Sequence, residues 1–124
     1  MADIEITNRE EFYHLIQNMN PGIIVIKFSA EWCKPCQKIK PLVTNCFNKL
    51  PDNAMCLTVD IDESFDLYAF LKQKKMLNGV PSLLCYHKNY DKEYAFIPKH
   101  SYSGSNENKI NMFFESCQQE CKNC

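Results

Sequence analysis

The sequence has little arginine, little net charge and no long apolar run. Arg9 is the only arginine among 124 residues, and the formal net charge at pH 7 is -1. The chain therefore lacks the basic face with which proteins bind nucleic acid or an anionic membrane surface. No apolar run approaches the roughly 20 residues of a membrane-spanning helix. These absences predict a protein whose partners include neither nucleic acid nor a membrane.

The first residues, MADIEITNREEF, also lack the basic start and apolar stretch of a secretory signal peptide. We therefore expect a cytoplasmic protein in a reducing compartment. Eight cysteines could form a secreted disulfide framework, but such frameworks belong to small domains with too little core. Because 45% of the residues are hydrophobic, the chain can build a core without disulfides. The sequence predicts a single domain over residues 1–124 that functions as a monomer.

The spacing of apolar residues predicts strands and helices that alternate along the chain. Short apolar, β-branched runs predict strands at 23–29, 55–62 and 82–86, with an alternating segment around Ile4 and Ile6 and a paired segment at 91–97. Helical spacing predicts the helices between them, including one from about residue 35 and a last one from 105 onward. This order predicts an α/β sandwich with a mixed five-stranded sheet and helices on both faces.

The segment WCKPC places Cys33 and Cys36 where a buried strand ends and a helix begins. Free amides at a helix start and the helix dipole favour the thiolate form of Cys33. Pro35 suits the first helical turn, where no N–H donor is required, and Lys34 adds a positive charge. A spacing of i, i+3 brings both sulfurs to one side of that turn. This arrangement favours disulfide exchange.

Zinc binding is the alternative for a cysteine pair, but it needs four ligands, and no second CxxC pair lies near the first. The tail carries three further cysteines that would share one face if the last helix continued: Cys117, Cys121 and Cys124. They could bind a metal with a histidine, but a frayed tail with free thiols is favoured. The other three are predicted to be small core residues: Cys46, Cys56 and Cys85. We therefore expect no metal and no cofactor.

The run FSAEWCKPCQKIKP, followed downstream by NGVPSLL, resembles the thioredoxin family, in particular its eukaryotic cytosolic members. The resemblance implies the thioredoxin fold and an enzyme that reduces protein disulfides. Cys33 would attack the substrate disulfide, Cys36 would resolve the mixed disulfide, and a thioredoxin reductase would restore the dithiol. Glutaredoxin is disfavoured, because its CPYC motif and its glutathione site after the cis-proline are absent.

The resemblance also implies roles for residues around the cysteine pair. Trp32 would form an apolar contact surface, and Asp62 matches an acid that lies near that tryptophan. Pro81 would be a cis-proline that packs against the active disulfide. The residue before it, Val80, would pair its backbone with an extended substrate segment.

Lys27 departs from the family pattern, in which a buried aspartate commonly stands at this position. Bacterial members often pair that aspartate with a lysine, where this chain has Thr58. If Lys27 is neutral, it could accept a proton from Cys36; if charged, it would stabilise thiolates and make the dithiol harder to oxidise. Lys34, in place of the usual glycine, would act in the same direction. Alternatively, Lys27 extends to the surface beside a strand edge and has little effect.

A second function stays open from the sequence. Lys27 could instead indicate relaxed catalytic demands, in a thioredoxin-like protein-binding module with weak or vestigial redox activity. Because Cys33, Cys36, Trp32 and Pro81 are all present, the active enzyme is favoured.

Overall fold

The structure is a computed structural model that describes residues 5–89, 91 and 93–124. Over these residues the chain forms helices and strands in this order: α1 (Arg9–Asn18), β1 (Ile23–Ser29), α2 (Lys34–Lys49), β2 (Ala54–Asp60), α3 (Phe65–Gln73), β3 (Ser82–His87), β4 (His100–Ser103) and α4 (Glu107–Lys122). The α/β class and the alternation predicted from the apolar pattern are confirmed.

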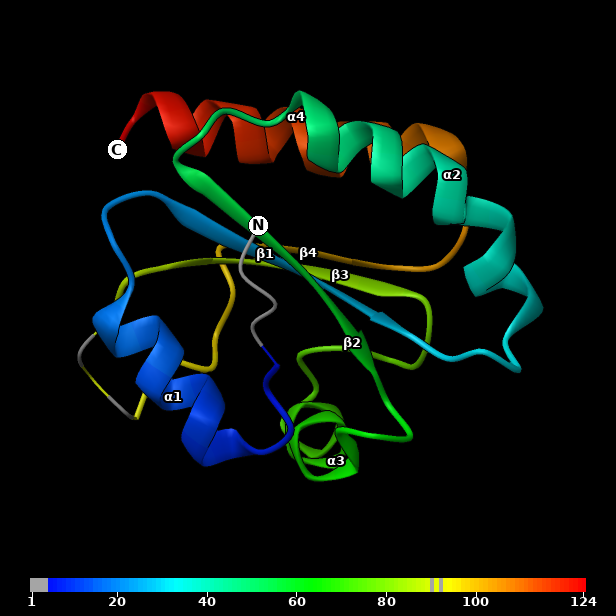
Figure 1. The fold of residues 1–124 in the computed structure, drawn as a ribbon, viewed down its shortest axis with the longest axis horizontal. Helices are drawn as coiled ribbons and strands as arrows, with labels where there is room; N and C mark the ends of the chain where they lie inside the picture. Colours follow the sequence, from blue (N-terminus) through cyan, green and yellow to red (C-terminus); the bar gives the residue numbers. More distant parts are fainter. Residues whose placement is uncertain (1–4, 90, 92) are drawn as a thin grey trace.

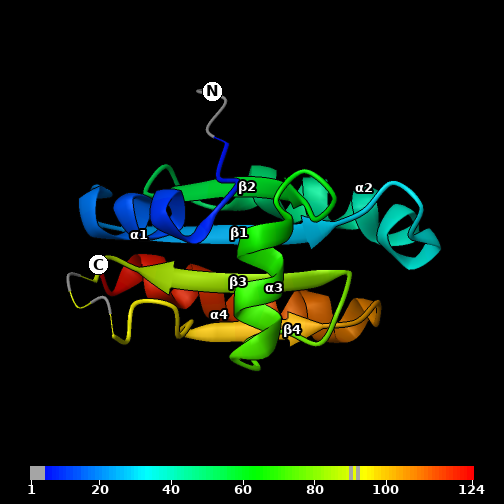
Figure 2. The same ribbon diagram turned by 90° about the horizontal axis from the view of Figure 1, so that it is seen from below.

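The strands form one mixed sheet in the order β2-β1-β3-β4. Strand β1 pairs in parallel with β2 and antiparallel with β3, and β3 pairs antiparallel with β4. Helices α2 and α4 cover one face of the sheet, and α1 and α3 lie on the other (Figure 1). The view in Figure 2, turned by 90°, shows β1 and β3 side by side in the middle of the sheet.

Strand β1 reads IIVIKFS and is buried on both faces because it lies between two neighbours. Its side chains alternate between two cores, as the pleat of a strand requires. Ile24, Ile26 and Phe28 pack in the core with residues of α1 and α3. Ile23 and Val25 pack on the opposite face with residues of α2 and α4. This double burial explains why the strand is apolar almost throughout.

The prediction of five strands is wrong for the described residues, which contain four. Part of the expected first strand, including Ile4, lies outside the described residues. Ile6 is buried but belongs to no strand. Its carbonyl oxygen accepts a hydrogen bond of 2.8 Å from the Ser64 hydroxyl. A side-chain hydrogen bond from a residue distant in sequence therefore occupies the backbone group that a neighbouring strand would have used.

The predicted strand at 91–97 is also wrong. Its described residues form turns, in which the Ala95 N–H donates to the Asp91 carbonyl oxygen at 2.9 Å and the Ile97 N–H donates to that of Tyr94 at 3.0 Å. The Asp91 carboxylate accepts the Glu93 N–H at 2.9 Å. Aspartate competes for nearby backbone donors in this way and so favours turns over strands. The partner of β3 is instead the later strand β4.

The frayed tail predicted for the last cysteines is wrong as well. Helix α4 continues to Lys122, and its apolar face lies against the sheet (Figure 1). Cys117 and Cys121 are therefore buried in the core between α4 and the sheet, whereas Cys124 is exposed beyond the helix. Cys85 is a core residue, as predicted, but Cys46 and Cys56 are only half-buried.

Candidate active site

Cys33 and Cys36 lie at the first turn of α2, directly after the loop that leaves β1. Cys33 is the N-cap residue, and its sulfur accepts a hydrogen bond of 3.3 Å from the Cys36 backbone N–H. Pro35 occupies the first turn, where its missing donor leaves no gap in the helix. Both cysteines are free thiols, with Cys33 6% exposed and Cys36 fully buried. The sulfur of Cys33 is therefore the one that a protein partner reaches first.

The Cys36 thiol ionises less readily than a free thiol. Burial raises the pKa of the Cys36 thiol, and the hydrogen bond with Cys33 acts in the same direction. Hydrogen bonds from the Ala30 backbone and the Ser29 side chain oppose this rise. Cys36 thus keeps its proton more tightly than a free thiol does. Ser29 and Ala30 were not singled out from the sequence, although both belong to the run FSAEWCKPC.

Antiparallel pairing of β1 with β3 brings the Val80–Pro81 segment to the cysteines. Phe28, near the end of β1, is in register with Ser82, the first residue of β3. The residues after β1 and those before β3 therefore meet at the same edge of the sheet. The Val80–Pro81 peptide bond is cis. The Cys33 sulfur lies 3.8 Å from the carbonyl oxygen of Val80.

Trp32 covers the site from the side of β2. Its ring is 66% exposed, and its Nε1 donates a hydrogen bond of 3.0 Å to an oxygen of Asp62. Asp62 follows the end of β2, and its own N–H is held by the Asp60 carboxylate at 2.8 Å. The hydrogen bond orients an indole that would otherwise turn freely in water. The result is a fixed, exposed apolar surface beside Cys33.

Lys27 is buried in the middle of the sheet and is only 4% exposed. It lies on β1 between Thr58 of β2 and Leu83 of β3, so the alternative in which it extends to the surface beside a strand edge is wrong. Burial lowers the pKa of its ammonium group, negative charge on Cys36 opposes this, and the positive charge of Lys40 adds to it. Lys34, in contrast, is exposed.

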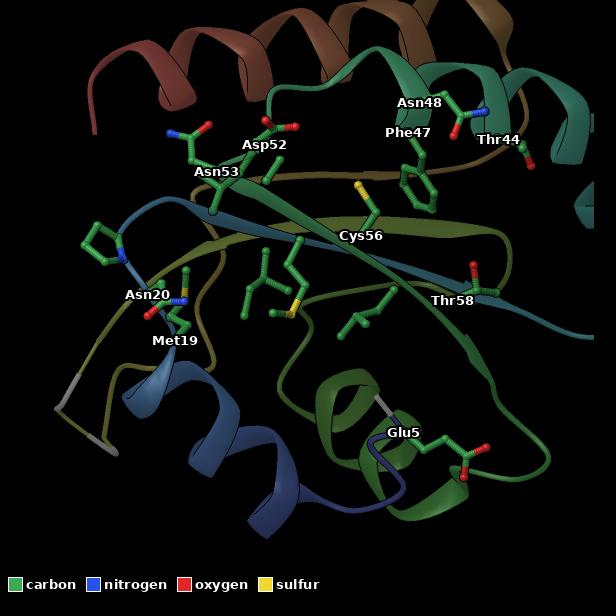
Figure 3. Close-up of a pocket in the computed structure, with 16 residues that line it drawn as sticks. Glu5, Met19, Asn20, Thr44, Phe47, Asn48, Asp52, Asn53, Cys56 and Thr58 are labelled. Atoms are coloured by element: carbon green, nitrogen blue, oxygen red, sulfur yellow. The ribbon is translucent and has the colours of Figure 1, made fainter. Parts of the chain in front are cut away.

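One cavity of the described residues lies away from the cysteine pair. It measures about 770 Å³ and extends along the outer edge of β2 between α1 and the end of α2 (Figure 3). Cys56 and Phe47 line it, but neither Cys33 nor Trp32 does. Burial raises the pKa of Cys56 to about 12, so this thiol is a poor nucleophile at neutral pH. The exposed ring of Trp32, next to Cys33 in the chain, suits a protein substrate better than a small molecule held in a cavity.

The described residues were also compared with the requirements of a metal site and of a membrane-spanning helix. They contain no group of three or more histidine, cysteine, aspartate or glutamate side chains placed to hold a metal ion. None of the helices that the structure describes is both long and apolar enough to cross a membrane.

Comparisons with known proteins place this arrangement in a family. The family model for thioredoxin matches residues 3–116. Thioredoxin 3 of Plasmodium falciparum (isolate 3D7) is 31% identical over 120 residues, which cover 96% of this chain and 62% of that protein's length. Thioredoxin of Ophiophagus hannah is 33% identical over 100 residues, which cover 81% of this chain and 84% of that protein.

Solved structures show the same fold. The crystal structure of Plasmodium falciparum thioredoxin matches with a TM-score of 0.65 and 26% identity, over 94% of this chain and 90% of that one. The oxidized form of mitochondrial thioredoxin 3 from Saccharomyces cerevisiae matches with a TM-score of 0.66 and 24% identity, over 90% of this chain and 92% of that one.

Proposed function

This chain belongs to the thioredoxin family and is a thiol–disulfide oxidoreductase that reduces protein disulfides, and we propose that Cys33 attacks the substrate and Cys36 resolves the intermediate. The observation that carries this assignment is the hydrogen bond from the Cys36 N–H to the Cys33 sulfur, at 3.3 Å. A backbone donor aimed at one sulfur stabilises negative charge on that sulfur. The buried Cys36 has a raised pKa and keeps its proton until it is needed.

The first step is attack by the Cys33 thiolate on a disulfide of the partner protein. A bond forms between Cys33 and one partner sulfur, and the other partner sulfur leaves as a thiolate. In the second step the Cys36 sulfur attacks Cys33. The partner's second sulfur leaves, and the Cys33–Cys36 disulfide remains. The partner gains two electrons, and the enzyme loses them.

Before the second step Cys36 must lose its proton, and we propose that the neutral amine of Lys27 accepts it. Burial lowers the pKa of Lys27 and raises that of Cys36, so the two values move toward each other. A proton can pass between two groups when neither binds it much more tightly than the other. The charged ammonium that results would then stabilise the Cys36 thiolate. The same charge favours the dithiol form, so we propose a reduction potential less negative than the about -270 mV typical of thioredoxin.

The substrate segment would lie extended across the site, beside Val80. The Val80 carbonyl oxygen already lies 3.8 Å from the Cys33 sulfur, so a strand paired with Val80 would bring its cysteine to Cys33. The exposed face of Trp32 would pack against apolar residues that flank this cysteine. We further propose that a thioredoxin reductase returns electrons to the disulfide, and that the protein acts as a monomer in the cytoplasm.

Reduction of insulin by dithiothreitol tests the assignment. We expect the protein to accelerate precipitation of the insulin chains and Cys33→Ser to abolish the acceleration, because Cys33 is the less buried of the two thiols. Cys46→Ser is the matched control, since Cys46 is a half-buried thiol further along α2. If the folded protein gives no acceleration, it is a binding module with vestigial redox activity. If Cys33→Ser keeps full activity, our assignment of the attacking thiol is wrong.

A further inference from the structure

A second CxxC pair lies at the other end of the molecule from the first. Cys121 and Cys124 belong to the segment CKNC, where α4 ends, and the Cys124 N–H donates to the Cys121 carbonyl oxygen at 3.4 Å. In Figures 1 and 2 the end of α4 and the start of α2 lie at opposite ends of the sheet. Cys121 is buried and Cys124 is exposed, so this pair combines an accessible thiol with a protected one.

A histidine lies beside the exposed thiol. The Cys124 sulfur is 3.6 Å from Nδ1 of His87, the last residue of β3. The other ring nitrogen of His87 lies 2.8 Å from one carboxylate oxygen of Glu120, and Nε2 of His100 lies 2.7 Å from the other. A thiol, an imidazole and a carboxylate in this order are the parts of an activated cysteine nucleophile.

The carboxylate determines which ring nitrogen of His87 carries the hydrogen. Hydrogen bonds from His100 and His87 lower the pKa of Glu120, so this side chain is ionised and can only accept. Nε2 of His87 must therefore donate to Glu120. In the neutral ring this leaves a lone pair on Nδ1, which faces the Cys124 sulfur and can take its proton.

The end of a helix is otherwise a poor place for a thiolate. The carboxyl end of α4 carries the negative end of the helix dipole, which disfavours a second negative charge. Burial raises the pKa of Cys121, and charge on Cys124 raises it further. Without a base at hand the pair would react slowly. His87 supplies the base that the helix end does not.

A cavity of about 430 Å³ adjoins this group, which is within the size range of small-molecule sites. His87, Glu120 and Asn123 line it, together with Lys88 and Lys99. Cys124 does not line the cavity itself, but its sulfur lies 3.6 Å from Nδ1 of His87, which does. The positive charge of Lys99 favours an anionic ligand, and the carboxylate of Glu120 is paired with two histidines. We propose that Cys124 and Cys121 form a second dithiol site that reduces small disulfides bearing carboxylates.

The reaction proceeds in two exchanges. His87 takes the proton of Cys124, whose thiolate attacks one sulfur of the small disulfide, so that a mixed disulfide forms and one small thiolate leaves. Cys121 then loses its proton and attacks the Cys124 sulfur, and the second small thiolate leaves. The Cys121–Cys124 disulfide remains. Two protein thiols are oxidised, one small disulfide is reduced to two thiols, and the two protons end on those products.

The test uses the full chain with Cys33→Ser and Cys36→Ser, so that the first pair cannot react. The reduced protein is mixed with glutathione disulfide and followed by intact mass and peptide mapping. We expect a Cys121–Cys124 disulfide as the product. Adding Cys121→Ser should stop the reaction at glutathione bound to Cys124, and Cys124→Ser should prevent it. Cys46→Ser is the control and should leave the rate unchanged. An unchanged rate in Cys124→Ser would overturn the proposal.

Two further measurements test the base and the cavity. His87→Gln should slow the reaction of Cys124 by about tenfold or more, as loss of a general base does. Glu120→Ala should slow it as well, whereas Glu120→Gln, which keeps an acceptor, should restore most of the rate. Circular dichroism checks that each variant is folded. Glutathione disulfide should react faster than the cationic disulfide cystamine. Equal rates for the two disulfides, or a His87→Gln rate equal to that of the parent, would contradict the proposed site.

Discussion

The two CxxC pairs of this protein have the same spacing but lie at opposite ends of their helices. Cys33 and Cys36 lie at the start of α2, whereas Cys121 lies in the last turn of α4 and Cys124 lies just beyond that helix. At the start of α2 a free backbone N–H donates directly to a sulfur, at 3.3 Å. At the end of α4 the free backbone groups are carbonyls, and a side chain, His87, approaches the exposed sulfur instead. The chemistry of a CxxC pair therefore depends on which end of a helix carries it.

The two pairs also differ in where their nearest base lies. Lys27 is buried under α2, in the central strand of the sheet, so its charge acts through a protein interior. His87 lies near the surface beside a cavity, so water and salt screen its charge. Changes at Lys27 should therefore alter both the equilibrium of the first pair and the stability of the fold. Changes at His87 should alter mainly a rate.

Removing the resolving thiol of the first pair should have the largest effect. We expect Cys36→Ser to reduce insulin turnover by roughly a thousandfold or more, because the Cys36 thiol can no longer attack the mixed disulfide on Cys33 and release the substrate. Proteins caught on Cys33 should be recovered after denaturing electrophoresis without reductant and lost when reductant is added. Full turnover in Cys36→Ser would mean that another thiol resolves the intermediate, and the two pairs would then not be separate sites.

Exchanging the buried base for an acid should have an intermediate effect. Lys27→Asp replaces a group that stabilises thiolates by one that repels them, so the dithiol should become easier to oxidise. We expect the reduction potential to become more negative by roughly 30 mV, or about tenfold in the exchange constant. Titration against glutathione redox buffers, with Cys121→Ser and Cys124→Ser present in both proteins, measures this shift for the first pair alone. Identical potentials would remove Lys27 from the mechanism.

Removing the buried charge should have the smallest effect, on stability. Because burial lowers the pKa of Lys27 from its ordinary value of 10.5, the unfolded chain binds more protons in the range between the two values. Burial of the charged Lys27 therefore reduces the free energy of unfolding by its full amount below the lowered pKa, and this loss of stability disappears as the pH rises toward 10.5. We expect Lys27→Met to raise the free energy of unfolding by roughly 1 kcal/mol at neutral pH. Urea unfolding should show this gain shrinking at alkaline pH; a gain independent of pH would contradict it.

Much of the first site could be predicted from the sequence, because its parts are local or carry a strong pattern. A continuous apolar run followed by WCKPC predicted a buried strand, a helix start and a cysteine pair between them, and the structure has all three. The resemblance added Asp62 and Pro81. The structure places Asp62 within hydrogen-bond distance of Trp32, at 3.0 Å, and the bond before Pro81 is cis.

Other features were missed either because local hydrogen bonds favoured turns or because the residues that decide them are distant in sequence. The strand expected at 91–97 has an alternating pattern, but turns anchored on Asp91 replace it. The tail cysteines were expected in a frayed end because nothing nearby in sequence covers them. In the structure the sheet covers Cys117 and Cys121. The contact between Cys124 and His87 joins residues with no shared pattern, so no periodicity could indicate it.

By itself, the sequence determined the fold class, the place of the first cysteine pair at a helix start, and the exchange chemistry that follows from it. These features depend on the periodicity of apolar residues and on neighbours along the chain, both of which are visible in the sequence. Only the tertiary structure decided that the Lys27 side chain is buried, that β4 rather than 91–97 pairs with β3, and that His87 and Glu120 meet at Cys124. Single charged or sulfur-bearing residues leave no periodic signal in a sequence. His87 at the end of β3 meets Glu120 and Cys124 only because α4 lies against the sheet.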